Sequence, residues 1–274
     1  MNENDGGPRL NLRSLLFVPG SRPERFDKAL AAGAGAVVLD LEDAVAPSDK
    51  ERARESVRAW LTPAHRVVVR VNAADTPWFA ADLALAAQPG VAALMLPKAE
   101  GAEALAAALR AGAKALLPLI ESAAGFAVLG TIAAAPGVAS LVFGSIDFQV
   151  DLGMRDARED ELLPFRTQIV LVSRLAGIAP PVDGVTTALD DEAQLRDDVL
   201  RARRLGFGGK LCIHPRQVAS VNRWLAPSEE EQAWARRVLD AAAASGGAAV
   251  AVDGKMVDKP VLMRAEGILR EARG

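Results

Sequence analysis

Residues 36–43 read Ala-Val-Val-Leu-Asp-Leu-Glu-Asp, a short apolar run that ends in carboxylates. Seven further runs are also apolar first and then polar or charged, and they lie at 13–19, 66–72, 93–98, 116–121, 141–147, 181–185 and 209–215. Near-continuous apolar runs that alternate with helical segments are typical of a parallel sheet covered on both faces. Eight such runs predict an α/β fold, a closed (β/α)8 TIM barrel, in which the chemistry gathers at the carboxyl ends of the strands.

The length of the chain fits one such barrel with a short addition. The chain has 274 residues, close to the roughly 250 that are typical of a single barrel. No linker rich in proline, serine or glycine divides it, so we expect the barrel over residues 1–227 and a C-terminal helical extension over residues 228–274. We expect this extension to pack on the barrel or on a neighbouring subunit.

The composition excludes several classes of protein. The net charge of −3 is small and no basic stripe interleaves with aromatic residues, so we expect no nucleic-acid partner. The single cysteine, Cys212, excludes an intrachain disulfide and fits a reducing compartment. Residues 1–8 are polar and acidic, unlike a signal peptide, and no apolar run is long enough to cross a bilayer. We therefore expect no membrane partner and a cytoplasmic location.

Two carboxylates, Glu121 and Asp147, end the fifth and sixth runs. Neighbouring parallel strands lie about 4.8 Å apart, so carboxylates at their ends are able to share one cation. Such a pair with open positions suits Mg²⁺, whereas the scarcity of histidine and cysteine disfavours zinc. In the alternative interpretation, Glu121 caps the following helix and Asp147 faces solvent.

Arg70 ends the third run inside a valine-rich stretch. A buried guanidinium needs an anion, and its planar fork suits a substrate carboxylate. A structural ion pair with the acidic residues that end the second run is the competing interpretation.

The second run ends in three acidic residues, Asp40, Glu42 and Asp43. Strand alternation places Asp40 and Glu42 on one face, and crowding of carboxylates raises the pKa of at least one of them, as acid–base chemistry requires. They serve equally well as ion-pair partners for Arg70 and Lys98. Lys98 itself we interpret as an ion-pairing residue rather than a Schiff-base lysine.

The connection from Phe148 to Leu163 is long and rich in acidic residues. Long loops on the rim of a barrel often act as lids or determine specificity. A solvated, charged loop explains the same composition, so both interpretations stay open.

Several segments carry motifs that occur together in one known family. They read LFVPG at 16–20, DLEDAV at 40–45, VRVN at 69–72, LPK at 96–98, PLIES at 118–122, FGSIDF at 143–148, CIHP at 212–215 and MVDKPV at 256–261. In this order they closely resemble the citrate lyase β-subunit-like proteins of the HpcH/HpaI aldolase family. The resemblance covers residues 13–270 and implies a TIM barrel of the phosphoenolpyruvate/pyruvate type.

The resemblance also implies a reaction. It is the reversible carbon–carbon cleavage of a β-hydroxyacyl thioester, of the citryl, citramalyl or malyl type, to an acetyl-type thioester and a 2-oxo acid. By this analogy Glu121 and Asp147 hold Mg²⁺, Glu121 borders the substrate, and Arg70 grips the carboxylate of the 2-oxo acid. The thioester carrier is either coenzyme A or an acyl carrier protein.

A catalytic role for Asp258 follows from the same resemblance. It matches an aspartate that relatives supply from a C-terminal segment, in some cases across a subunit boundary, and we expect it to exchange a proton with the acetyl thioester carbon. Glu42 and Asp43 are weaker candidates for supporting acid–base roles. In the alternative interpretation Asp258 only caps the last helix.

The resemblance favours a homo-oligomer, with a trimer as the first choice. Two other functions remain open, a subunit that presents an acyl carrier within a citrate lyase-like complex and an aldolase of free 2-oxo acids.

Overall fold

The chain forms two compact units that divide between Asn222 and Arg223. The computed structural model describes residues 11–244 and 250–273, so the predicted polar segment at residues 1–8 lies outside the described residues. The predicted division between residues 227 and 228 falls slightly later in the chain. None of the described helices combines the length and the apolar character that crossing a membrane would require.

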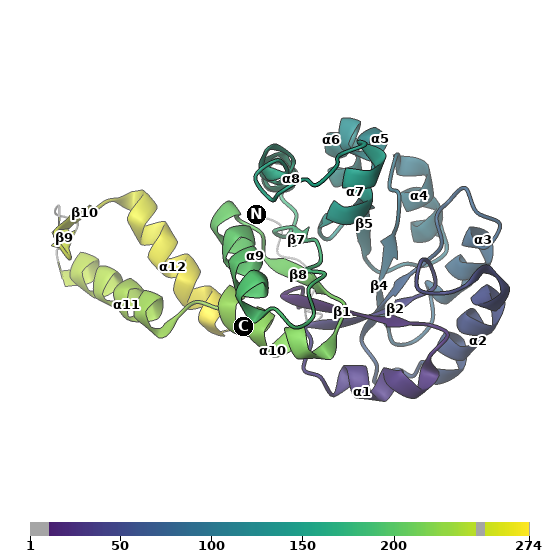
Figure 1. Ribbon diagram of the computed structural model, residues 1–274. Helices are drawn as coiled ribbons and strands as arrows, with labels where there is room; N and C mark the ends of the chain where they lie inside the picture. The colour runs from purple at the N-terminus through teal and green to yellow at the C-terminus, as the bar shows by residue number, and fades with distance from the viewer. Residues whose placement is uncertain (1–10, 245–249, 274) are drawn as a thin grey trace. The chain divides into compact units, whose positions relative to one another are not determined.

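The first unit is a closed barrel of eight parallel strands (Figure 1). Each predicted run contributes residues to one strand, and the predicted (β/α)8 barrel is confirmed. The strands are β1 (Ser14–Pro19), β2 (Ala36–Asp40), β3 (Val67–Arg70), β4 (Val91–Leu96), β5 (Leu116–Ile120), β6 (Val142–Phe143), β7 (Val182–Asp183) and β8 (Gly209–Cys212).

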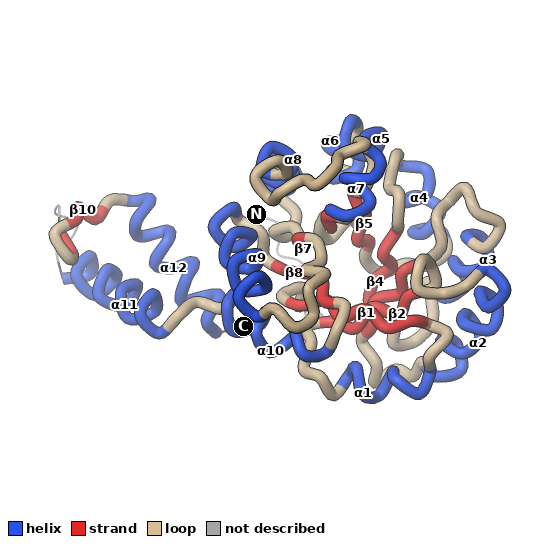
Figure 2. Tube along the Cα trace, viewed as in Figure 1, coloured by secondary structure: helices blue, strands red, loops and turns tan. Residues whose placement is uncertain are grey.

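Helices connect these strands and surround them, as Figure 2 shows in blue around red. They are α1 (Phe26–Leu30), α2 (Lys50–Trp60), α3 (Phe79–Asp82), α4 (Ala102–Arg110), α5 (Ala123–Ala127), α6 (Leu129–Ala133), α7 (Ser145–Asp151), α8 (Leu163–Ala176), α9 (Glu192–Leu205) and α10 (Pro215–Leu225). Short 3₁₀ helices lie at Pro23–Arg25, Pro47–Asp49 and Leu83–Leu85. α5 begins at Ser122, whose hydroxyl accepts a hydrogen bond from the Gly125 N–H, so Ser122 rather than Glu121 caps this helix.

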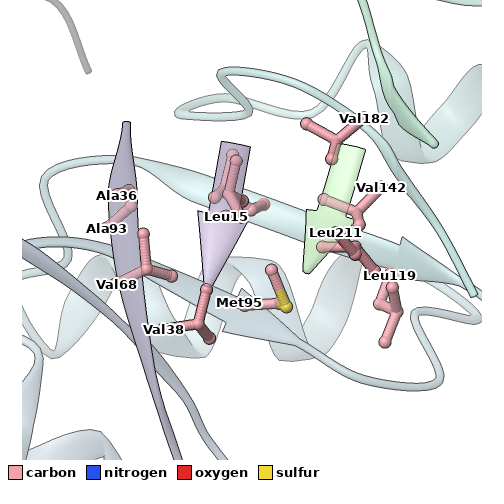
Figure 3. Packing of buried hydrophobic residues seen from close by; sticks show 11 residues of the cluster. Leu15, Ala36, Val38, Val68, Ala93, Met95, Leu119, Val142, Val182 and Leu211 are labelled. Atoms are coloured by element: carbon pink, nitrogen blue, oxygen red, sulfur yellow. The ribbon is translucent and has the colours of Figure 1, made fainter. Parts of the chain in front are cut away.

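Alternate residues of the strands form an apolar cluster between the strands (Figure 3). Side chains on a strand alternate between its two faces, so one residue in two faces the barrel interior. On β2 this face carries Ala36 and Val38, and on β5 it carries Leu117 and Leu119. The next residues in these two columns are Asp40 and Glu121. The alternation that builds the core therefore also directs polar side chains into the carboxyl end of the barrel.

The barrel closes where β1 pairs with β8, with Leu15 opposite Leu211. Gly209 begins β8, and a Cβ at this position would collide with the carbonyl oxygen of Leu12 and come within 3.1 Å of Val182. The absence of a side chain at Gly209 thus lets the chain before β1 approach β8 closely.

The second unit contains a helical hairpin and a small antiparallel sheet. Its elements are α11 (Glu229–Ala244), β9 (Val250–Val252), β10 (Lys255–Val257) and α12 (Lys259–Arg273). The turn between β9 and β10 places Asp253 and Gly254 at positive φ, as an Asp-Gly hairpin turn requires. Ala235, Val238 and Ala265 form the centre of its core.

Candidate active site

The carboxyl ends of the strands border a cavity of about 430 Å³. Apolar side chains from β1, β5 and the residues after β8 line it together with charged side chains from β2, β3, the residue after β5 and α7. It lies where the polar ends of the predicted runs converge. Its lining includes Phe17, Arg70, Leu119, Glu121, Asp147 and Ile213.

Arg70 ends β3 directly opposite Asp40, which ends β2. Its Nε and Nη2 atoms donate to the two oxygens of Asp40, both at 2.7 Å, and the guanidinium lies 4.9 Å from the centre of the Phe17 ring. Asp40 also accepts hydrogen bonds from the backbone N–H groups of Glu42 and Ala44. These four contacts fix the orientation of the Asp40 carboxylate, so it positions Arg70.

Glu42 and Asp43 complete the acidic surroundings of Arg70. Their nearest oxygens lie 2.9 Å and 3.5 Å from its Nη1 atom. Burial opposes the charge of Arg70, but its hydrogen bonds to Asp40 and the surrounding negative charges raise the pKa of the guanidinium. The structural ion pair predicted as an alternative therefore exists, and Arg70 lines the cavity as well.

The pKa of Glu42 rises to about 7 because the side chain is buried, although Arg70 partly offsets this. The sequence predicted that crowding would raise the pKa of at least one of these carboxylates. Glu42 shows a raised pKa, but burial is its main cause and the charges of Asp43 and Asp40 contribute less. Asp43 differs from Glu42 because its side chain is 64% exposed.

Glu121 follows β5 directly and is buried, with 5% of its surface exposed. Burial, followed by the charges of Glu42 and Asp147, raises its pKa to about 8, and only the hydrogen bond from the Lys98 N–H and the charge of Arg70 oppose this. A cation beside Glu121 would relieve the repulsion between these carboxylates.

The sequence predicted that Asp147 ends the sixth strand, but in the structure it lies in the first turn of α7. β6 ends at Phe143, and the chain enters α7 after Gly144. Asp147 is exposed and lines the same cavity as Glu121. The side of the barrel was thus predicted correctly for Asp147, whereas the type of element was wrong.

The donor set at this rim fits Mg²⁺. Glu121 and Asp147 supply oxygen ligands, and Mg²⁺ commonly takes one or two carboxylates while it keeps several waters. Across residues 11–244 and 250–273 no three His, Cys, Asp or Glu side chains gather into a potential metal site.

Asp258 belongs to the second unit and precedes α12. Its Oδ1 atom accepts a hydrogen bond from the N–H of Val261 at 3.1 Å, so the capping role predicted as an alternative exists. The cavity belongs to the first unit, and a catalytic role for Asp258 remains a prediction.

The surroundings of Lys98 and Cys212 do not support a catalytic role for either side chain. Lys98 is exposed and forms no ion pair within 4.0 Å with any residue that the structure describes, although its charge lowers the pKa of Glu42. Cys212 is buried in β8, and burial raises the pKa of its thiol to about 12, which excludes a thiolate nucleophile near neutral pH.

Sequence reasoning missed the apolar wall of the cavity and a buried ion-pair network behind it. Phe17 and Ile213 lie inside predicted runs at the positions that strand alternation directs inward, so the alternation alone could have predicted them as lining residues. The network joins Arg166 of α8 to Asp183 of β7 at 2.8 Å and to Glu159 at 2.6 Å. These partners lie on separate segments, so no local pattern predicts them.

Comparisons with known proteins identify the family of this chain. A "Citrate lyase subunit beta-like protein" from Deinococcus radiodurans is 40% identical, and the match covers 96% of this chain and 98% of the relative. An "L-malyl-CoA/beta-methylmalyl-CoA lyase" from Rhodobacter capsulatus is 35% identical over 96% of this chain and 95% of its own length.

A solved structure and a family model extend this result. The CitE protein from Mycobacterium tuberculosis, in complex with magnesium, acetoacetate and coenzyme A, is 38% identical with a TM-score of 0.83, and the match covers 95% of this chain and 98% of that chain. The model of the HpcH/HpaI aldolase/citrate lyase family matches residues 13–215. The chain belongs to the HpcH/HpaI aldolase/citrate lyase family.

Proposed function

We propose that this protein is a Mg²⁺-dependent carbon–carbon lyase. It cleaves a β-hydroxyacyl-CoA thioester of the citryl, citramalyl or malyl type reversibly to an acetyl-type thioester and a 2-oxo acid. The observation that carries the proposal is the buried Glu121 carboxylate beside Arg70 and Asp147 in one cavity. The activities and ligands named for its relatives support the same reaction.

Glu121 and Asp147 hold the metal in this proposal. Bound Mg²⁺ polarises the oxygen of the substrate that becomes the carbonyl of the 2-oxo acid. Glu121 is suited to this role because burial raises its pKa, so a divalent cation stabilises its ionised form. Glu121 also borders the bound 2-oxo acid, because both occupy the same end of the cavity.

Arg70 binds the carboxylate of the 2-oxo acid. Asp40 occupies its Nε–H and one N–H of Nη2, and Glu42 lies 2.9 Å from Nη1, so the second N–H of Nη2 remains for a further anion. Phe17 packs against the guanidinium and Leu119 adds apolar surface, so the ion pair with substrate forms where little water competes.

The bonds that break and form in the cleavage require groups that transfer protons. The substrate hydroxyl loses its proton to a base, its carbon becomes the carbonyl of the 2-oxo acid, and the carbon–carbon bond breaks. The electron pair of this bond passes to the thioester enolate, which then takes up a proton. Asp258 exchanges this last proton, either from its own chain or from a neighbouring copy in a homo-oligomer, for which a trimer is the first choice. Glu42, whose pKa is near 7, and Asp43 support the acid–base steps.

Incubation with citramalyl-CoA, malyl-CoA and citryl-CoA, each with Mg²⁺ and with a chelator, tests the proposal. We expect acetyl-CoA and the matching 2-oxo acid to appear only with Mg²⁺. The Glu121→Gln variant should lose this activity, whereas Glu103→Gln on the exposed face of α4 should keep it.

The products separate the other functions. Release of free coenzyme A and the intact hydroxy acid would show hydrolysis and overturn the lyase assignment. Cleavage of free 2-oxo acid aldols alone would indicate an aldolase without a thioester. Turnover only when an acyl carrier protein and partner subunits are added would indicate a subunit of a larger complex. The cytoplasmic location stays a prediction.

A further inference from the structure

Lys98 adopts a left-handed backbone conformation, with φ at 45°. Lysine rarely takes this conformation, because its Cβ then approaches its own carbonyl oxygen. Such a residue persists where its surroundings determine its conformation, and it often lies beside a functional site. Lys98 lies two residues after β4, at the end of the barrel that holds the cavity.

This conformation directs two successive N–H groups toward β5 and the residue after it. The Lys98 N–H donates to Oε1 of Glu121 at 2.7 Å, and the Ala99 N–H donates to the carbonyl oxygen of Leu119 at 3.3 Å. In an extended strand, successive N–H groups point to opposite sides, so a continued β4 would provide only one of these bonds. The left-handed turn at Lys98 is therefore what brings a donor to Glu121.

Gly144 lies against the other oxygen of Glu121. A Cβ on Gly144 would lie 2.7 Å from Oε2 and 2.5 Å from Cβ of Glu121. The backbone of Gly144, with φ at −85° and ψ at 69°, lies outside the positive-φ region that favours glycine. Glycine at this position thus provides space for the Glu121 side chain rather than conformational freedom.

The ammonium group of Lys98 takes no part in these contacts. The side chain is exposed and lacks an ion pair within 4.0 Å among the described residues. Ala99, in contrast, is buried, and its carbonyl oxygen lies 2.5 Å from the position of a Cβ on Gly125 in α5. The packing therefore holds the backbone of this turn, whereas the Lys98 side chain is exposed and acts on Glu42 only through its charge.

We infer that Lys98 is a positioning residue that acts through its main chain. Its backbone N–H, in the left-handed turn, and the absence of a side chain at Gly144 together fix the Glu121 carboxylate for the cation. This inference rests on the metal role of Glu121 in the proposed function. It assigns no function to the lysine ammonium. Partners that orient a metal ligand typically change metal affinity about 10–100-fold when they are lost.

A series of substitutions at Lys98 tests the inference in the full chain, with the dissociation constant for Mn²⁺ as the readout. Lys98→Gly and Lys98→Ala keep the N–H and remove the ammonium, and they should bind Mn²⁺ within about twofold of the wild type, because neither removes an orienting partner. Lys98→Val has a β-branched side chain that opposes positive φ, and it should bind about tenfold more weakly or worse. Lys114→Val, at the amino end of β5, is the matched control and should bind normally.

Gly144→Ala tests the other side of Glu121. It should weaken Mn²⁺ binding about tenfold, because the new methyl group displaces the carboxylate. Gly130→Ala in α6 is the control, since a Cβ there meets nothing within 4 Å. Circular dichroism melting of each variant shows whether the fold is retained.

The binding constants of these variants decide whether Lys98 and Gly144 position Glu121. Normal binding by Lys98→Val, or a loss in Lys98→Gly comparable with that in Glu121→Gln, overturns the inference and leaves the metal site intact. No Mn²⁺ binding by the wild type overturns the metal site and the inference together. If Lys98→Val does not fold, the retained affinity of Lys98→Gly and the loss in Gly144→Ala remain the required results.

Discussion

Asp40 illustrates how one side chain determines the state of another in this site. It accepts the fork of Arg70 and two backbone N–H groups of the turn that carries Glu42, and it is 1% exposed. All four of these hydrogen bonds orient the carboxylate toward Arg70 and its own turn. Asp40 is therefore needed for the geometry of Arg70.

Substitution Asp40→Asn should disturb Arg70 without removing bulk. The amide places donors where the guanidinium needs an acceptor, so we expect an apparent KM at least about tenfold higher and a loss of roughly 3–5 kcal/mol in the free energy of unfolding, the usual effect of breaking a buried ion pair. Steady-state kinetics and urea unfolding measure both quantities. Asp43→Asn is the control for stability alone, because its exposed carboxylate lies 3.5 Å from Arg70 and should contribute little to the free energy of unfolding. Unchanged kinetics in Asp40→Asn would contradict this role.

The carboxylates Glu42 and Glu121 make the stability of the metal-free protein depend on pH. Their pKa values rise from an ordinary 4.5 to about 7 and about 8, because both side chains are buried. Between the ordinary and the raised value the folded state holds protons that the unfolded state has released. The free energy of unfolding contributed by these groups therefore falls as pH rises through this range.

We expect the melting temperature in the presence of a chelator to fall between about pH 5 and about pH 8, in the range set by these pKa values. The double variant Glu42→Gln/Glu121→Gln should lose most of this slope, and Mg²⁺ should stabilise the wild type more at pH 8 than at pH 5. Calorimetric melting at several pH values measures the difference. A wild-type slope equal to that of the double variant would refute the assignment.

At the scale of elements, the strands were predictable and the element after β6 was not. The eight runs are long, apolar and bounded by polar residues, and the strand periodicity alone directs Arg70 and Glu121 to the correct end of the barrel. The run at 141–147 is too short to distinguish a strand from the start of a helix, so Asp147 was placed on the wrong element. The left-handed turn at Lys98 leaves no trace in the sequence, because its cause is packing around Ala99.

The same limit applies to the long connection between α7 and α8. Sequence composition allowed a lid or a solvated loop, and the structure instead shows Glu159 of this segment within 2.6 Å of Arg166 and 2.9 Å of Arg201. Arg166 also lies 5.5 Å from the centre of the Phe143 ring, which lines the cavity. The connection is thereby anchored to α8, α9 and, through Arg166, to the wall of the site.

Arg166→Ala should weaken this junction. It leaves Asp183, which is fully buried, without its partner at 2.8 Å, so we expect a loss of roughly 3–5 kcal/mol in the free energy of unfolding. The exposed Arg174→Ala on the same helix is the control and should change stability little. Guanidinium unfolding of both variants gives the comparison. Equal stability of the two would mean that the pair contributes no more than a surface charge.

At the scale of the whole molecule, the proposed reaction draws on both units. Glu121 and Arg70 belong to the barrel, and Asp258 belongs to the C-terminal unit, where it caps α12. Asparagine caps helices about as well as aspartate, so Asp258→Asn should leave α12 intact and remove only the ionisable group. This substitution separates the structural role of Asp258 from the catalytic one.

Mixing Asp258→Asn with Glu121→Gln tests whether the two units cooperate between copies of the chain. Each variant alone should be inactive. If a neighbouring copy supplies Asp258, random exchange of subunits restores about a quarter of the sites. Assays after co-refolding measure the recovery. No recovery, with both variants folded and oligomeric, would show that Asp258 acts in its own chain or not at all.

The closure of the barrel has a consequence for folding during translation. β1 pairs with β8, and the Ser14 hydroxyl donates to Asn222, 208 positions along the chain. While the ribosome still holds the last strand, both borders of the growing sheet lack their neighbours. An unpaired, apolar strand border is a template for aggregation. We therefore expect a chain that is truncated before β8 to aggregate rather than to form a smaller barrel, and the solubility of such a chain on expression measures this.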